Sequence, residues 1–315
     1  MPASLNAILP VIGLIAVGYV AVRSGLFARD QADILNRYVF TIAAPALLFR
    51  NTALTEIPDV IPWGLWISYY ASMLGCLALG MGVSLVLSPT RRLAERVIIG
   101  FGSGFSNTVM LGIPVILTAF GDAAGTPLFL ILAFHGLIIF STTTVLLEFA
   151  TNRATGLRDT LPAVLRSLSG QQVVIALAAG VVWSLLGLGL AEPVDQFLDV
   201  LGQSAIPVAL VAVGGTLATV EVRRSLGVAG YVSVMKLIVH PLIAFSLATY
   251  VFDLAGLWVA VITVLAAMPT GVFTSVFANR YGAAPGAASS TITITTLCAA
   301  VTVPIWLSLF AEYLR

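Results

Sequence analysis

Apolar runs follow one another along nearly the whole chain, separated by short polar connections. A helix needs ~20 apolar residues to cross the hydrocarbon core of a membrane. Ten runs meet this length, and they cover residues 4–22, 34–52, 60–87, 97–120, 127–149, 171–190, 196–219, 227–251, 255–278 and 288–312. The pattern predicts an all-α polytopic membrane protein with ten transmembrane helices. We expect the first run to be a retained helix rather than a cleaved leader, because no Lys or Arg precedes it.

Composition agrees with a lipid environment. Of the 315 residues, 59% are hydrophobic and 9% are charged, and the mean hydropathy is +1.04, whereas soluble domains carry about 25% charged residues. The net charge of +1 says little about partners, and no basic stripe indicates a nucleic-acid partner. Cys76 and Cys298 lie in separate apolar runs, and no His, Cys, Asp or Glu cluster has metal-ligand spacing. We therefore expect neither a metal nor a cofactor.

The basic residues predict the orientation. Connections after the odd-numbered runs hold twelve of the fifteen Lys and Arg residues. The positive-inside rule places these connections in the cytoplasm and both termini on the periplasmic side. The longest of them, residues 151–170, is basic and is expected to form a helix on the cytoplasmic surface.

Five runs precede this connection and five follow it, which suggests an internal repeat. The first repeat covers residues 1–150 and the second covers 171–315, joined by the linker 151–170. Because five is odd, the second repeat must be inserted upside down. Run two ("TIAAPALLFRNTAL") resembles run seven ("QSAIPVALVAVGGTL"), with Pro45 and Pro207 in comparable places near mid-membrane.

The fourth and ninth runs, which correspond between the repeats, each contain helix-breaking residues. Gly112 and Pro114 interrupt the fourth, and Pro269 and Gly271 interrupt the ninth. We expect second half-helices to begin near the two prolines, with both N-termini directed to the membrane centre. Each N-terminus carries roughly +0.5 charge and attracts anions. The alternative is that each proline merely kinks its helix.

Ionisable groups inside the runs are few. Lys236 lies about nine residues into run eight, and His240 lies one turn later on the same face. Lys236 either neutralises the carbonyl ends of the first half-helices or takes part in transport. His240 is interpreted as a packed histidine, with proton coupling as the alternative, and His135 is a still weaker candidate for a functional role. No Asp or Glu lies at mid-membrane, which argues against cation transport as the main activity.

These motifs carry a resemblance to a known family. "NTVMLGIPV" from Asn107 resembles the crossover motif of the auxin efflux carriers, which include plant auxin carriers and bacterial permeases. "KLIVHPLIA", "AAMPTGVFTSVFANRYG" and "SAIPVALVAVGGTL" resemble further signatures of the family in the same order. The resemblance implies the fold of bile-acid symporters and sodium/proton antiporters. Helices 1, 2, 6 and 7 would form a scaffold domain, and helices 3–5 and 8–10 would form a transport domain that moves by a rocking or elevator motion.

The resemblance also implies a function. We expect a secondary transporter of small organic carboxylates, such as auxin-like acids, malate or malonate, in a bacterial inner membrane, as a homodimer through scaffold helices. By resemblance, Asn107 matches the crossover asparagine, Pro114 and Pro269 the crossover prolines, and Lys236 a basic position in helix eight. A sodium-coupled symporter of the bile-acid type is the alternative; an intramembrane enzyme and a channel are less favoured.

The candidate residues fall into three groups. The candidate substrate-binding residues are Ser106, Asn107, Thr108, Gly112, Pro114, Pro269, Thr270 and, from the scaffold, Gln203. The candidate coupling or crossover-stabilising residues are Lys236 and His240. The candidate hinge positions are Pro45, Pro207 and Gly271.

Overall fold

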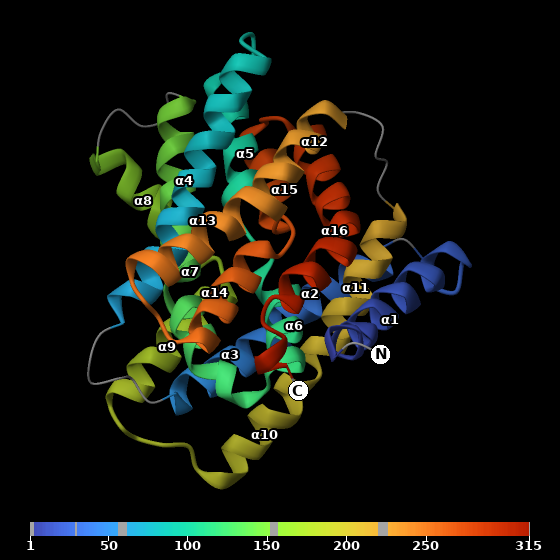
Figure 1. Cartoon of the computed structure of the whole chain (residues 1–315), viewed down its shortest axis with the longest axis vertical. Helices are drawn as coiled ribbons and strands as arrows, with labels where there is room; N and C mark the ends of the chain where they lie inside the picture. The colour runs from blue at the N-terminus through green and yellow to red at the C-terminus, as the bar shows by residue number, and fades with distance from the viewer. Residues whose placement is uncertain (1–2, 29, 56–61, 152–156, 220–225, 315) are drawn as a thin grey trace.

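The chain folds into an all-helical structure, shown in Figure 1 as a computed structural model that describes residues 3–28, 30–55, 62–151, 157–219 and 226–314. Within these residues, six helical stretches are long and apolar enough to cross a membrane: Gln31–Leu54, Trp63–Leu87, Asp122–Ala150, Glu192–Ala218, Leu226–Val251 and Pro285–Ser308. Shorter apolar helices cover Leu9–Arg23, Thr108–Phe120, Gln172–Leu185 and Gly256–Ala267. A polytopic helical membrane protein is thus confirmed, while ten spans in two inverted repeats stay a prediction.

The helices follow the predicted runs closely, and each run contains helical residues. The elements before residue 150 are α1 (Ala3–Arg23), α2 (Gln31–Tyr38), η1 (Val39–Ala43), α3 (Ala44–Leu54), α4 (Trp63–Leu87), α5 (Leu93–Gly104), η2 (Thr108–Gly112), α6 (Ile113–Phe120), η3 (Asp122–Ala124) and α7 (Gly125–Ala150). Those after it are α8 (Leu157–Ser169), α9 (Gln172–Leu185), α10 (Glu192–Gln203), α11 (Ala205–Thr219), α12 (Leu226–Val234), η5 (Met235–Val239), α13 (His240–Ser246), η6 (Leu247–Val251), α14 (Gly256–Ala267), α15 (Phe273–Tyr281), α16 (Pro285–Ser308) and η7 (Ala311–Tyr313).

Two predicted segments between the repeats can be compared with the structure. The connection 151–170 contains α8, so its helical character is confirmed for the described residues. The sixth run was extended too far, because α9 ends at Leu185 rather than at residue 190. Gly187 and Gly189 both have a φ of +62°, a left-handed conformation that terminates helices and favours glycine.

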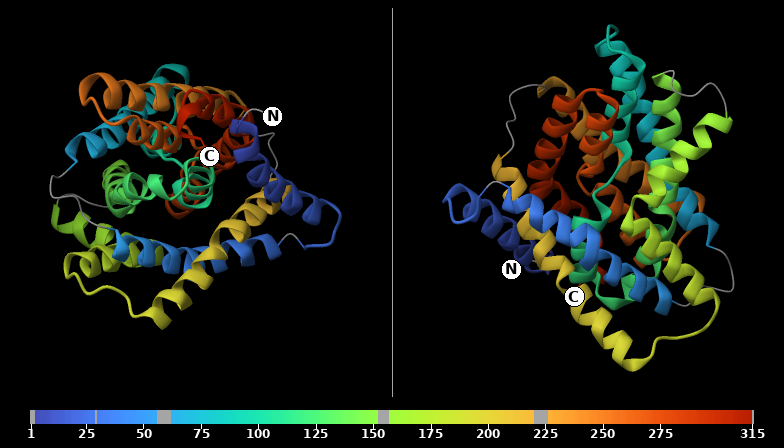
Figure 2. Two further views of the ribbon diagram at one scale, coloured as in Figure 1. Left: turned by 60° about the horizontal axis from the view of Figure 1, so that its bottom comes forward. Right: turned by 180° about the vertical axis from the view of Figure 1, so that it is seen from behind.

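The helices pack in two groups (Figure 2). In one group α1 packs on α11, α3 on α9 and α10, and α2 on α11. In the other α4 packs on α5 and α13, α12 on α16, and α13 on α14. The helices α1, α2, α3, α9, α10 and α11 correspond to runs 1, 2, 6 and 7. The division into a scaffold and a transport domain that move as separate units stays a prediction.

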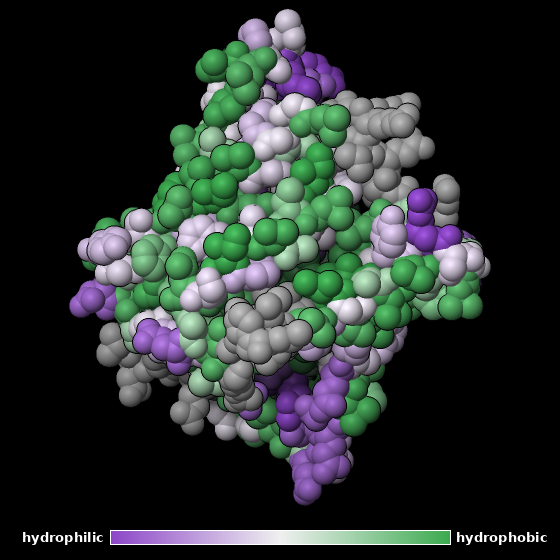
Figure 3. Space-filling view, turned by 45° about the vertical axis from the view of Figure 1, so that its right-hand side comes forward, coloured by the Kyte–Doolittle hydropathy of each residue, from purple (hydrophilic) through white to green (hydrophobic). Residues whose placement is uncertain are grey.

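Apolar side chains cover much of the outer surface. Val86, Leu26 and Val200 are each more than 70% exposed, and a space-filling view shows hydrophobic residues over the middle of the face and hydrophilic residues gathered toward its ends (Figure 3). A soluble protein avoids such an extended apolar surface, whereas acyl chains of a bilayer solvate it.

Glycines allow α4 and α5 to approach closely. A Cβ atom at Gly104 would lie 2.4 Å from the Met73 carbonyl oxygen, and one at Gly100 would lie 2.5 Å from that of Leu77. Small residues four positions apart are a common way to bring membrane helices into backbone contact. The close pairing fixes α5, and therefore the non-helical segment that follows it.

Gly104→Ala is expected to destabilise the protein. The added methyl group collides with backbone rather than with a flexible side chain, and overpacking of this kind costs about 1–3 kcal/mol. Gly75→Ala on α4 is the matched control, since no heavy atom lies within 4 Å of a Cβ there. Thermal unfolding in detergent should show a lower Tm for the first variant and little change for the second. Equal Tm values would contradict the packing described.

Wide helical turns precede three of the prolines inside the membrane. The π-helical turns Val39–Ala43, Thr108–Gly112 and Met235–Val239 each end two residues before a proline. A proline cannot donate to the carbonyl four residues earlier and its ring collides with it. At Pro241 that carbonyl belongs to Leu237, and the Trp306 indole donates to it at 2.9 Å. A widened turn therefore accommodates each proline without ending the helix.

The two hinge candidates differ in their surroundings. Pro45 follows the first of these wide turns and lies in the first turn of α3. Pro207 lies in the first turn of α11, just after a turn at Ser204 that separates it from α10. Their role as hinges stays a prediction.

Candidate functional site

Two helices are interrupted at the centre of the molecule. The first stops at Gly104 (α5) and resumes at Thr108 (η2, continuous with α6). The second stops at Ala267 (α14) and resumes at Phe273 (α15). The two non-helical segments therefore lie in the fourth and ninth predicted runs.

Backbone hydrogen bonds join these segments, with a single antiparallel bridge between Ser106 and Thr270. The Asn107 N–H donates to the Pro269 carbonyl at 2.8 Å, and the Gly271 N–H donates to the Phe105 carbonyl at 3.0 Å. Unwound backbone at membrane depth must find partners inside the protein. Here each break supplies them to the other.

The exact placement of both breaks differs from the prediction. Gly112 and Pro114 lie within continuous helix, because the π-helical turn before Pro114 absorbs the proline. Gly112 instead packs on α14, where a Cβ would lie 2.8 Å from Leu265 Cδ2. In the ninth run Pro269 lies in the unwound segment, and helix begins four residues later at Phe273.

Polar groups neutralise the carbonyl ends of the first half-helices. The Lys236 Nζ donates to the Ala266 carbonyl at the end of α14 (2.5 Å) and lies 3.0 Å from His240 Nδ1. The Thr270 Oγ1 donates to the Gly102 carbonyl near the end of α5 (2.7 Å). The last carbonyls of a helix lack intrahelical donors and carry partial negative charge. A fully buried ammonium group is well suited to one such end.

Thr270, a predicted substrate-binding residue, does not line any of the three cavities around the breaks that are described below. Its side chain is fully buried, and its N–H donates to Thr295 Oγ1 at 3.1 Å. Together with the bond to α5, this makes Thr270 a structural residue that ties the two breaks to α16.

A small cavity of about 40 Å³ borders the beginnings of both second half-helices. Ser106, Asn107 and Thr108 line it from one break, and Gly271 and Phe273 line it from the other. Two positive helix ends therefore converge on one space, as expected for an anion site.

Gly271 has no room for a side chain. A Cβ there would lie 2.2 Å from Cε1 of the Phe105 ring, and this ring also lines the small cavity. The residue type at 271 is thus explained by close packing of an aromatic ring on the backbone.

A larger cavity of about 410 Å³ lies between the two helix groups. α2 and α11 line one side, and α15 and α16 line the other. Its polar lining comprises Asp33, Asn36, Asn107, Gln171, Thr216, Ser275, Ser289, Thr293 and Thr296. This volume is in the range of a small-molecule site.

Asn107 borders both cavities. The residue is 6% exposed, and its side chain makes no capping hydrogen bond to the helix that it precedes. An amide offers two donors and an acceptor oxygen. Asn107 therefore lies at the first break and borders both cavities, and its role in substrate binding stays a prediction.

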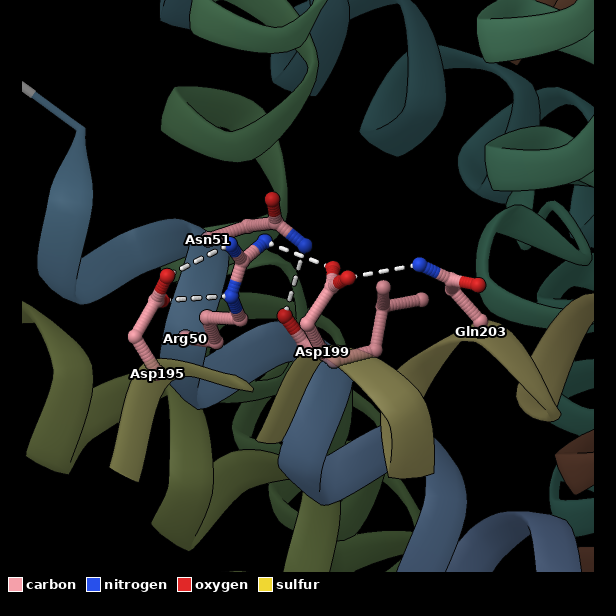
Figure 4. A network of polar contacts seen from close by, with 6 residues as sticks. Arg50, Asn51, Asp195, Asp199 and Gln203 are labelled. Atoms are coloured by element: carbon pink, nitrogen blue, oxygen red, sulfur yellow. Dashed lines mark hydrogen bonds and ion pairs between the residues drawn. The ribbon is translucent and has the colours of Figure 1, made fainter. Parts of the chain in front are cut away.

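Gln203 lies elsewhere, at the C-terminal end of α10 in a polar network that runs along this helix (Figure 4). Its Nε2 donates to Asp199 at 2.6 Å. Arg50 from α3 binds Asp195 through Nε (2.6 Å) and Asp199 through Nη1 (3.0 Å). Gln203 does not line either of the two cavities around Asn107.

The sequence did not indicate that His135 lies beside Asn107. His135 lies on α7 and lines the small cavity together with Asn107. A single histidine in an apolar run does not reveal this position, because the break after α5 is distant from His135 in sequence. Among the described residues, no group of three or more His, Cys, Asp or Glu is placed to hold a metal ion.

Comparison with known proteins identifies the family. Residues 3–307 match the family described as "Membrane transport protein". The chain belongs to this family, the auxin efflux carriers. It is therefore a multi-pass membrane transporter, and the family resemblance seen in its motifs is confirmed.

Three relatives align with most of the chain. A "Putative malonate transporter" of Rhizobium meliloti is 27% identical over 94% of this chain and 92% of its own length. An "Uncharacterized transporter" of Methanothermobacter thermautotrophicus is 26% identical, covering 96% and 97%. "Uncharacterized transporter YfdV" of Escherichia coli is 24% identical, covering 96% of both chains. The family match and the three alignments therefore each cover nearly the whole chain.

Proposed function

We propose that this chain is a secondary active transporter of small organic carboxylates. The observation that carries the proposal is the convergence of two helix N-termini and Asn107 on adjoining cavities at the paired breaks. Oriented N–H groups and an amide are suited to bind a carboxylate. The relative named as a malonate transporter makes a dicarboxylate the first substrate to test.

The paired breaks would act as the crossover of a ten-helix fold of two inverted repeats. In this proposal, helices 1, 2, 6 and 7 stay in place as the scaffold, and the remainder carries Asn107 across the membrane. The large cavity supports this division, since its two sides belong to the two helix groups. Closing that cavity and opening an equivalent one on the other side gives alternating access.

The conformation fits a state that opens to the cytoplasm. Asp33 and Ser289, which line the large cavity, are close in sequence to connections that the positive-inside rule places in the cytoplasm. On the other side of the breaks, the 110 Å³ cavity near Pro269 has a lining that is almost entirely apolar. We infer that the apolar contacts of α1 with α6 and α16 close the periplasmic route.

A carrier that works without sodium is favoured over the bile-acid type of symporter. The Lys236 ammonium is already bound at the Ala266 carbonyl, where it provides positive charge at the crossover. A sodium site would need several free oxygens. The Thr270 and Thr295 hydroxyls are bound within the protein, whereas the buried hydroxyls of Thr274 and Ser290 have no partner in the described structure, so the comparison of Na⁺ with choline decides between the two carriers.

Counterflow in proteoliposomes tests the proposed function. Vesicles loaded with unlabelled malonate should accumulate labelled malonate from outside, whether the medium contains Na⁺ or choline. Malate, succinate and indole-3-acetate are tested as competitors, with neutral glycerol as the control.

The result separates the alternatives. Accumulation that depends on internal malonate indicates a carrier, because a channel shows no trans-stimulation. Accumulation that requires Na⁺ would favour the symporter. No accumulation of any anion by folded protein would contradict the proposal.

A further inference from the structure

His135 is buried beside the substrate cavity without a hydrogen-bond partner. Its side chain is 5% exposed, and neither Nδ1 nor Nε2 has a partner within the described structure. Most buried polar groups in proteins are paired, so an unpaired one calls for a physical explanation. The ring lines the same cavity as Ser106 and Asn107, and about 40 Å³ is enough for at least one water-sized ligand group.

Aromatic packing holds the His135 ring in place. Phe105 stacks on it with centroids 5.6 Å apart, and Tyr69 and Tyr70 contact it at 5.7 Å and 6.4 Å. Phe105 belongs to the first break, where its carbonyl accepts from Gly271. The ring is thus fixed relative to the crossover by stacking, which leaves its nitrogen atoms uncommitted.

No carboxylate among the described residues contacts the ring. From α4 the titratable neighbours are Tyr69 and Tyr70, and Tyr69 in turn lies 6.1 Å from the ring of His240, which binds Lys236. The helices α9 and α14, which also pack on α7, contain no ionisable side chain.

Other elements that pack on α7 also carry ionisable residues, but Glu95 and Arg96 on α5, Asp122 on η3 and Arg166 on α8 do not line the cavity that His135 borders. Lys236 on η5 is bound to the Ala266 carbonyl and lies against His240. Glu148, on α7 itself, accepts a hydrogen bond from Tyr281 at 2.7 Å. On α3, Arg50 binds two aspartates. A proton on His135 would therefore create an unpaired buried cation in the empty site, which is strongly disfavoured.

A bound anion lowers the free-energy cost of protonating His135. A carboxylate held at Asn107 would be close to His135, because both residues line one cavity. It would supply the missing countercharge and accept a charge-assisted hydrogen bond from the imidazolium ion. Charging the ring and binding the anion would then favour each other.

We propose that His135 takes up one proton when a carboxylate binds beside Asn107, so that proton and anion cross the membrane together. The inference rests on the proposed function. The proton comes from water on the side to which the cavity opens, and it returns to water on the opposite side when the anion leaves. The anion gradient and the pH gradient are thereby coupled through one residue.

Calorimetry of malonate binding at pH 7.5 in buffers of different ionisation enthalpy tests this. Both carboxylates of free malonate are ionised at this pH. Any proton taken up from the buffer on binding is therefore taken up as the complex of protein and malonate forms. The wild type should take up about one proton per malonate, and its Kd should rise roughly tenfold per pH unit. His135→Gln should bind malonate without proton uptake, and His240→Gln should still take up the proton.

Three results would overturn the inference. The first is that the wild type binds malonate without proton uptake, a result that needs no variant. The second is that proton uptake persists in His135→Gln. The third is that proton uptake is lost only in His240→Gln. If no carboxylate of the panel binds folded wild-type protein, the proposed function itself fails. That outcome differs from the first three, in which malonate binds and only the coupling is refuted.

Discussion

Asn107→Ala should weaken malonate binding by about 10- to 100-fold. The variant removes a hydrogen bond to a charged ligand, which typically contributes about 1.5–3 kcal/mol, and each 1.4 kcal/mol corresponds to a factor of ten in Kd. Asn107 lies between the two cavities at the beginning of the second half-helix. Isothermal titration with purified protein in detergent measures the change.

Asn279→Ala provides the matched control, since Asn279 is exposed near the end of α15. Its affinity for malonate should equal that of the wild type. The Tm of Asn107→Ala must also be measured, because Asn107 contributes its backbone N–H to the pairing of the breaks. An Asn107→Ala protein that folds normally and binds malonate with unchanged Kd would contradict the site.

Lys236→Met should lower the stability of the protein by about 2–3 kcal/mol. The variant keeps the length of the side chain but leaves the Ala266 carbonyl and His240 Nδ1 without their donor, and a buried unsatisfied group costs about 1–3 kcal/mol. Thermal unfolding should show a decrease in Tm. Ile238→Met, two residues away on the 46% exposed side of the same segment, should show almost none.

Transport by Lys236→Met separates the two interpretations of this lysine. If Lys236 stabilises the crossover, the variant transports malonate below its Tm, at a rate comparable to the wild type. A variant with wild-type stability and no transport would instead show that the ammonium group acts in the transport cycle. Lys236→Gln, which retains a donor of shorter reach, should fall between wild type and Lys236→Met in Tm.

The sequence predicted the location of the paired breaks better than their details. The motif around Asn107 and the i, i+4 pair of Lys236 and His240 are local features, and the structure brings each to the paired breaks. The position of the first break was wrong because a proline signal does not distinguish the end of a helix from a widened turn. Pro114 follows such a turn, and the helix continues through it.

Features that depend on packing between distant segments could not be predicted from the sequence. Gln203 was chosen because it is near Pro207, but Asp199 on the same helix binds its amide. Conversely, His135 joins the site only because α7 packs on α5. The large cavity is formed by four elements from both halves of the chain, so no single motif indicates it.

Transport current from proteoliposomes on a solid-supported membrane tests the central claim most directly. Malonate, malate, succinate and indole-3-acetate are applied in turn, first with choline and then with Na⁺. The account predicts a saturable current for at least one of these carboxylates without Na⁺, and its loss in Asn107→Ala. A folded protein that gives neither current nor counterflow with any carboxylate, yet transports a cation or a neutral solute, would contradict it.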